Sequence, residues 1–272
     1  HLSIRRQRQM CIRDRDETGD EYYISLWKTD GTTGGTVNLQ PTLYDDDSSI
    51  SSMLKVGNIV YFEADDGVHG SELWKSDGTT SGTVLVKDIR LSGSNEISNL
   101  TAIGSTVYFS ATDDTNGFEL WKSDGTEGGT VMVADINPSG NSDLYDITVM
   151  DNTLYFTAND GTSGNELWKS DGTEVGTVMV KDIHTSDASY PSYMYSFGDH
   201  VYFRASDGIH GQELWKSDGT EEGTVMVKDI HPSSDSGPAD FIATNNTLYF
   251  MSGDGTHGYE LWKTDGTAEG TV

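Results

Sequence analysis

Residues 166–178 read Glu-Leu-Trp-Lys-Ser-Asp-Gly-Thr-Glu-Val-Gly-Thr-Val, and the chain repeats this stretch with few changes. The tryptophan of the stretch recurs every 47 residues without insertion or deletion, at Trp27, Trp74, Trp121, Trp168, Trp215 and Trp262. A fixed period of this length is typical of repeat architectures, in which each copy is one supersecondary unit. The sequence therefore predicts a tandem array of similar folding units.

One period carries four strand signals, here named a to d, which turn signals separate. Strand a is irregularly apolar, as in residues 144–150, and the two-residue turn Asp151-Asn152 links it to strand b, residues 154–156. Gly, Asn and Asp tolerate the positive φ of a tight hairpin, and aromatic residues favour strands. Strand c carries Glu-Leu-Trp-Lys and strand d Thr-Val-Met-Val-Lys-Asp-Ile, with Asp-Gly-Thr between them. The order predicts one four-stranded antiparallel sheet per copy.

Strands c and d place bulky residues at successive positions, which indicates a sheet that is covered on both faces. Stacked four-stranded sheets of this kind are the blades of a β-propeller. We therefore predict an all-β repeat domain over residues 16–272, a β-propeller or an incomplete propeller arc of about 5.5 blades. The predicted boundaries are a half blade at 22–39 and blades at approximately 50–90, 97–137, 144–184, 191–231 and 238–272.

The first and last copies depart from the pattern. In the first, Ser25 replaces the motif glutamate, Pro41 stands where the next copy has Asp88, and strands a and b have no recognisable counterpart. The last copy stops at Val272, at the start of strand d. We interpret the chain as a piece of a longer array.

The opening segment, residues 1–15 (HLSIRRQRQMCIRDR), is unlike the repeats. It holds Cys11, which is the only cysteine, and five arginines, and it resembles read-through from a sequencing adapter. We exclude this basic leader from the fold and expect it to be disordered or artefactual.

Composition excludes several functional classes. The formal net charge is −27, with 44 acidic and 17 basic side chains, so the chain would repel nucleic acid and anionic membrane surfaces. No run of eighteen apolar residues is present, which argues against membrane insertion. A single cysteine leaves the repeats without a disulfide or a thiolate metal site.

The motif Glu-Leu-Trp-x-x-Asp-Gly-Thr-x-x-Gly resembles the bacterial ELWxxDGT repeat, a family of large secreted or surface proteins. It stands intact at residues 72–82, 119–129, 166–176, 213–223 and 260–270, and the resemblance covers residues 20–272. The resemblance implies an extracellular or cell-surface repeat protein. It brings no general enzymatic activity.

Turn formation is enough to explain the aspartate between strands c and d. Its side chain can accept hydrogen bonds from the backbone amides two residues on, and the glycine after it can take positive φ. We therefore interpret the tryptophans above and Asp77, Asp124, Asp171, Asp218 and Asp265 as structural.

Calcium is the first candidate ligand. The b–c loops repeat an aspartate six residues before the motif glutamate, at Asp66, Asp113, Asp160, Asp207 and Asp254. Oxygen-rich loops that contain glycine suit Ca²⁺, although the spacing differs from that of an EF-hand. Turn formation is the alternative role for these aspartates.

Histidines of the b–c and d–a loops are the second candidate, because both loops emerge on one face of a blade. They are His69, His184, His210, His231 and His257. Imidazoles on one rim could bind a transition metal, but different blades hold them, so solvated loop histidines are the alternative.

Two non-repeated features complete the candidates, because a specific site breaks the symmetry of the array. The acidic triplet Asp45-Asp46-Asp47 lies in the first d–a loop, and the tyrosines are Tyr190, Tyr193 and Tyr195. Tyrosines can form a platform for sugar or peptide, whereas Tyr193 and Tyr195, at strand a, could equally belong to the core.

The sequence leaves two functions open. The first is a non-catalytic extracellular scaffold that binds protein or glycan for adhesion, with or without calcium. The second is a propeller enzyme, a glycoside hydrolase or lyase, that acts on extracellular polysaccharide. A glycosidase needs two unlike carboxylates about 5 to 9 Å apart, whereas each carboxylate here is copied in successive blades. We expect no catalytic residues and favour the scaffold.

Overall fold

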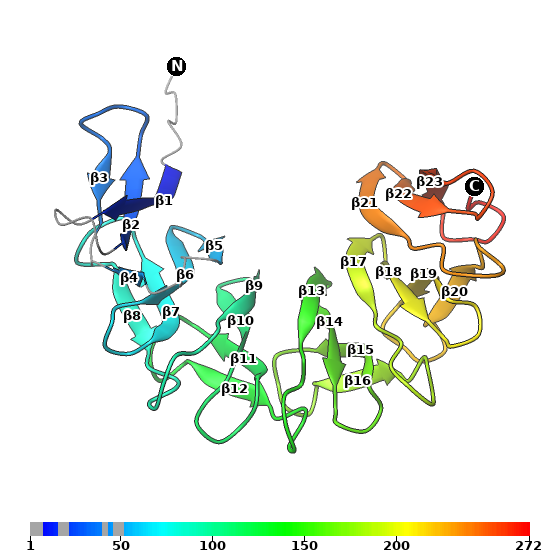
Figure 1. The fold of residues 1–272 in the computed structure, drawn as a ribbon, viewed down its shortest axis with the longest axis horizontal. Helices are drawn as coiled ribbons and strands as arrows, with labels where there is room; N and C mark the ends of the chain where they lie inside the picture. The colour runs from blue at the N-terminus through cyan, green and yellow to red at the C-terminus, as the bar shows by residue number, and fades with distance from the viewer. Residues whose placement is uncertain (1–7, 16–21, 40–42, 46–51) are drawn as a thin grey trace. The chain divides into compact units, whose positions relative to one another are not determined.

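The computed structural model describes residues 8–15, 22–39, 43–45 and 52–272 (Figure 1). The described residues form strands and turns, and among them no helix is long and apolar enough to cross a membrane. The chain divides into two compact units. The first comprises His1–Asn116 and Trp121–Met132, and the second comprises Gly117–Leu120 and Val133–Val272.

Each copy of the repeat folds into its own antiparallel sheet, as the spacing of the tryptophans predicts. The second sheet consists of β5 (Met53–Val56), β6 (Ile59–Asp65), β7 (Ser71–Ser76) and β8 (Val84–Lys87). The third consists of β9 (Ser98–Ile103), β10 (Thr106–Ala111), β11 (Glu119–Ser123) and β12 (Val131–Ala134).

The fourth and fifth sheets repeat this order of strands. The fourth holds β13 (Tyr145–Met150), β14 (Thr153–Asn159), β15 (Asn165–Ser170) and β16 (Val178–Lys181). The fifth holds β17 (Ser192–Phe197), β18 (His200–Ser206), β19 (Gln212–Ser217) and β20 (Val225–Lys228). Their four strands are the predicted strands a to d.

The sixth sheet holds β21 (Ala239–Thr244), β22 (Thr247–Gly253) and β23 (Tyr259–Thr264). In place of strand d, the amide and carbonyl groups of Val272 pair with those of Lys263. Because β23 has little cover, Leu261 is 67% exposed, whereas its counterpart Leu214 is fully buried.

The first sheet differs from the sequence expectation. β2 (Tyr22–Thr29) and β3 (Val37–Asn38) form the predicted half blade, and β4 (Leu43–Asp45) also pairs with β2. The leader residues Arg8–Arg15, expected to lie outside the fold, form β1 and pair with β2. Met10 lies opposite Trp27, as Phe62 lies opposite Trp74, so β1 takes the place of strand b. An unpaired edge of β2 offers free N–H and C=O groups, which favours pairing with a neighbouring segment.

Strands a and b are joined by the tight turns that the sequence predicts. Gly57, Gly104 and Gly198 have φ of 60°, 61° and 64° there, and Asp151 and Asn152 have 49° and 60°. The glycines, which lack Cβ, and the Asp-Asn pair suit this left-handed backbone.

Aromatic and aliphatic side chains fill the space between successive sheets within each unit. In the first unit, Phe62 and Trp74 pack with Leu26 of the first sheet, and Tyr61 packs in a cluster with Trp121 of the third. In the second unit, one cluster joins the fourth and fifth sheets and another joins the fifth and sixth. Both faces of an inner sheet are therefore buried, as the bulky pattern of strand c predicts.

Candidate ligand-binding site

The Asp-Gly-Thr turn between strands c and d is held by its own side chains. In the fourth sheet, Asp171 Oδ1 accepts the amide of Thr173 at 2.9 Å and its hydroxyl at 2.6 Å. The Ser170 and Thr177 hydroxyls lie 2.7 Å apart and tie the two ends of the turn together. Asp77, Asp124, Asp218 and Asp265 make the same bonds, so the structural interpretation of these aspartates agrees with the geometry.

The last glycine of the motif is required by the aspartate before it. A Cβ on Gly176 would lie 2.0 Å from Asp171 Oδ1, and one on Gly129 would lie 2.1 Å from Asp124 Oδ1. The aspartate cannot easily move aside, because the turn uses the same oxygen as its acceptor. The lack of space beside the aspartate therefore explains why the motif has glycine at this position.

The motif lysine joins neighbouring sheets within each unit. Lys75 Nζ donates to Gly125 O at 2.7 Å in the first unit, and Lys169 Nζ donates to Gly219 O at 2.8 Å in the second. Lys216 makes the same bond to Gly266 at 2.9 Å. The acceptor is always the glycine of the following Asp-Gly-Thr turn, so this lysine is part of the contact between sheets.

A second lysine, at the end of strand d, reinforces the same contact. Lys87 Nζ donates to Thr130 O at 2.8 Å and lies 5.9 Å from the centre of the Trp121 ring. Lys228 repeats the arrangement with Thr271 O at 2.6 Å and Trp262 at 5.7 Å. These lysines are thus engaged with backbone oxygens and with tryptophan, which is a further structural role for the tryptophans.

The motif glutamate fixes the loop that leaves strand d. Glu166 is fully buried, and its carboxylate accepts the amide of Ile183 at 2.8 Å and both the amide and the hydroxyl of Ser189 at 2.9 and 2.6 Å. Burial raises the pKa of Glu166 and raises that of Glu72 and Glu119 to about 7. In the second to fifth sheets, the repeated carboxylate therefore holds a loop rather than facing a substrate.

The aspartates proposed as calcium ligands belong to separate b–c loops and bind their own loop. Asp207 Oδ1 accepts the amides of Ile209 and His210 at 2.9 Å each, and Asp207 Oδ2 lies 2.7 Å from His210 Nδ1. Asp66, Asp113, Asp160 and Asp254 form the same turn, with His, Asn or Ser as the side-chain partner. Burial alone would raise the pKa of Asp207, but these hydrogen bonds hold it below its usual value.

The loop histidines are likewise distributed over several sheets. His69, His210 and His257 each bond the aspartate three residues before them, which raises the pKa of these histidines. His184 and His231 instead lie against Gly208 and Gly255 of the following sheet. Among the described residues, no three His, Cys, Asp or Glu side chains are placed to hold a metal ion.

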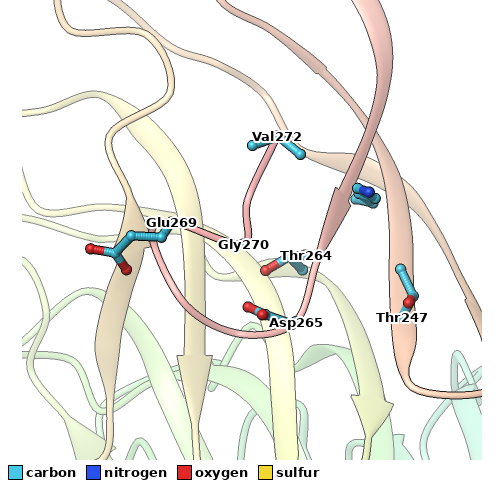
Figure 2. A pocket seen from close by; sticks show the side chains of 7 residues that line it. Thr247, Thr264, Asp265, Glu269, Gly270 and Val272 are labelled. Carbon is cyan, nitrogen blue, oxygen red and sulfur yellow. The ribbon is translucent and has the colours of Figure 1, made fainter.

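The acidic triplet and a shallow pocket near the end of the sixth sheet do not form a convincing site. Asp45 is in β4, and Asp46 and Asp47 lie outside the described residues. The pocket in Figure 2 is lined by Thr247, Lys263, Thr264, Asp265, Glu269, Gly270 and Val272. Lys263 is the counterpart of Lys216, which receives the turn of the following sheet, so this pocket corresponds to a sheet-to-sheet contact surface.

The three candidate tyrosines fall into two classes. Tyr195 packs against Phe241, with ring centres 6.4 Å apart, and its hydroxyl accepts the amide of Ala243 at 3.3 Å. These contacts favour the core alternative for Tyr195, because its ring packs between the fifth and sixth sheets. Tyr190 and Tyr193 are 51% and 44% exposed.

Both exposed tyrosines have a left-handed backbone. Tyr193 has φ of 58° in a bulge of strand a, where three other copies have Asn99, Asp146 and Asp240 with φ of 55° to 58°. Asn and Asp tolerate this conformation, whereas a bulky residue there costs about 1–2 kcal/mol. Tyr190, with φ of 50°, likewise stands where Asp143 and Gly237 have 47° and 58°.

Arg204 on strand b completes the cluster around Tyr193. Its guanidinium carbon lies 4.4 Å from the centre of the Tyr193 ring, and its Nε donates to Ser192 Oγ at 2.8 Å. Asp146 Oδ2 accepts the Tyr193 amide. Burial raises the pKa of Asp146, while the Tyr193 and Met194 amides and Arg204 partly offset that effect. The four side chains join strand a of the fourth sheet to strands a and b of the fifth.

Sequence reasoning did not single out Arg204, Ser192 or Asp146. A comparison of the copies position by position contains the signal for Arg204, because Glu63, Ser110, Thr157 and Met251 stand at the equivalent place. Asp146 fits the repeat pattern, and only the fold places it beside Tyr193.

Comparisons with known proteins bear on the fold. No protein-family model and no curated protein matches the chain. Puromycin hydrolase is similar in structure, with a TM-score of 0.51 and 14% identity over 97% of this chain and 45% of that chain. Its S511A mutant complexed with PGG gives 0.53 and 14% over 94% and 43%.

TolB from Acinetobacter baumannii has a TM-score of 0.46 and 12% identity over 95% of this chain and 61% of that chain. The chain spans less than half of the hydrolase. The similar solved structures are β-propeller proteins. An all-β fold of antiparallel four-stranded sheets, similar to the sheets of propellers, is therefore what the comparisons and the geometry together show.

Proposed function

We propose that the chain is a non-catalytic, propeller-like scaffold that works outside the cell and binds a protein or a glycan. One observation carries the proposal: the polar groups of the repeated motif form the sheets and join them. Glu166 holds a loop, Asp171 holds a turn, and Lys169 bonds the following sheet. Such a motif builds a surface and leaves recognition to residues that differ between copies.

The extracellular location rests on the resemblance of the motif to the ELWxxDGT repeat. The sheets would be successive blades of a propeller or of a propeller arc, with the first and sixth sheets less complete than the four between them. Puromycin hydrolase is an enzyme by its name, but a likeness at 14% identity over less than half of its length supports the fold and not the reaction.

A binding and turnover assay tests this function against the enzymatic alternative. The fluorescently labelled full chain would be applied to immobilised neutral and acidic polysaccharides and to surface-protein extracts, and soluble reducing ends would be measured in parallel. We expect saturable binding to at least one surface with no increase in reducing ends. Reducing ends that rise in proportion to protein would favour the hydrolase or lyase, and the absence of saturable binding on every surface would contradict the scaffold.

A further inference from the structure

Two positions of the fifth sheet depart from the repeat in a way that folding does not require. Tyr190 and Tyr193 replace residues that suit a left-handed backbone, and about half of each side chain is exposed. Core packing therefore does not offset the backbone strain. A strained, exposed and non-repeated residue is a sign of function.

Arg204 lies beside Tyr193 in a fixed orientation. Tyr193 covers one face of the guanidinium, and Ser192 accepts from its Nε, so the orientation of the planar group is fixed. Within residues 52–272, its two terminal nitrogens have no protein acceptor. An arginine that is anchored through Nε and a ring face keeps its terminal N–H groups available for a planar anion.

Arg204 is the cation of the cluster, and among the described residues its terminal donors are not used by the fold. Most repeat lysines already donate to backbone carbonyls, as Lys169 and Lys216 do. The Asp146 carboxylate accepts the Tyr193 amide and its charge is felt by Arg204. Within residues 52–272, however, the two form no direct ion pair, so the terminal N–H groups of Arg204 stay available. Arg204 is thus a cation with unused donors in a chain of net charge −27.

We propose that Tyr190, Tyr193 and Arg204 bind a carboxylate-bearing saccharide, such as a uronate unit of a glycan. The terminal N–H groups of Arg204 pair with the carboxylate, and the two tyrosines offer ring surface and hydroxyl groups to the sugar. This inference rests on the proposed scaffold function and names its ligand.

The net charge of the chain limits the form of the ligand. Long polyanions such as nucleic acids are repelled by the acidic surface as a whole. A single carboxylate is affected mainly by groups within about 8 Å at physiological salt, where Arg204 is close. A short uronate oligosaccharide therefore fits the cluster better than a long polyanion.

The test is isothermal titration calorimetry of the full chain with three probes. They are trigalacturonate, neutral galactotriose, which lacks the carboxylates, and an acetylated tri-glutamate peptide, which lacks the sugar. We expect trigalacturonate to bind at least tenfold more tightly than either other probe, and its affinity to fall as salt is raised. Equal affinity for galactotriose would overturn the role of the carboxylate. Equal affinity for the peptide would overturn the role of the sugar.

Substitutions taken from the other copies make the test specific. Arg204→Met installs the residue of the sixth sheet and Tyr193→Asn that of the third, and each should reduce trigalacturonate affinity at least tenfold. Arg204→Lys keeps the charge without the planar fork and should also weaken binding. Tyr259→Asn, which changes an exposed tyrosine elsewhere in the same unit, is the control and should bind like the wild type.

Thermal unfolding separates a binding role from a structural one. Tyr193→Asn relieves a left-handed tyrosine, so its melting temperature should equal or exceed that of the wild type even though binding is lost. A lower melting temperature together with the loss of binding would instead assign Tyr193 a structural role. Saturable glycan or protein binding that survives in both Arg204→Met and Tyr193→Asn would overturn this site while leaving the scaffold function in place.

Discussion

Lys169 Nζ donates a hydrogen bond of 2.8 Å to the carbonyl oxygen of Gly219, fifty residues further along the chain. The same bond joins Lys216 to Gly266. The fifth motif therefore supplies a donor to the sixth and an acceptor to the fourth. The contact is therefore directional.

Loss of the lysine should weaken the array where the bond is made. Lys216→Met keeps most of the apolar stem and removes the charged donor, so we expect the free energy of unfolding to fall by about 1–2 kcal/mol. Urea denaturation measures this change. Lys263→Met is the matched control, because Lys263 holds the same motif position but is exposed, and it should change stability by less than about 0.5 kcal/mol. Equal losses in the two variants would contradict a role for the inter-sheet bond.

The two neighbouring glycines of the third motif should respond differently to alanine. A Cβ on Gly129 would lie 2.1 Å from Asp124 Oδ1, whereas a Cβ on Gly128 would have no atom within 4 Å. Gly129→Ala should therefore lower the melting temperature and the free energy of unfolding, by about 1–3 kcal/mol, as the turn bonds are displaced. Gly128→Ala should be close to neutral. A near-neutral Gly129→Ala would show that the turn can open at little cost.

The buried glutamates should make stability depend on pH. Burial raises the pKa of Glu72 to about 7 from the usual 4.5, so the folded state binds the proton more tightly than the unfolded state. Proton binding to Glu72 therefore stabilises the folded state fully below about pH 4.5, and this stabilisation is lost as the pH rises through about 7. Between pH 5 and pH 8, the wild type should lose about 2 kcal/mol relative to Glu72→Gln.

Urea denaturation of the two proteins across this range gives that difference directly. Glu260→Gln, at the exposed counterpart in the sixth sheet, serves as the matched control. A constant difference between the wild type and Glu72→Gln at all pH values would contradict the titration of Glu72.

Calcium should have little effect on thermal stability. The b–c loop aspartates accept hydrogen bonds within their own loops, as Asp207 does from the amides of Ile209 and His210. We expect melting midpoints in calcium and in chelator to agree within about 1 °C, because a ligand that binds only the folded state would raise the midpoint. A rise of several degrees with calcium, lost in Asp207→Asn, would establish the cation site that the spacing of the aspartates suggested.

The sequence could predict everything that depends on neighbours along the chain. The hairpin at Asp151-Asn152 and the turn at Asp171 follow from residues that tolerate or stabilise a local backbone shape, and both are confirmed. The strand order within a copy follows from the same signals. The period of 47 residues extends this prediction to the whole array, because it indicates that the copies fold alike.

Contacts between copies could not be predicted in this way. The bond from Lys216 to Gly266 depends on how one sheet stacks on the next, and no local pattern encodes that distance. The bulge that places Tyr193 beside Arg204 is likewise a property of strand pairing. β1 is a third case, since its pairing is set by the open edge of β2.

The directional bond between copies has a consequence for how such a gene can change. A junction made of a Lys donor and a Gly acceptor is the same wherever it occurs, so recombination that adds or removes a whole period leaves every remaining junction correctly matched. An exchange that is out of phase by even one residue would misalign the donor and turn the strand side chains to the wrong face. Copy number can therefore drift freely in evolution, whereas the length of the period cannot.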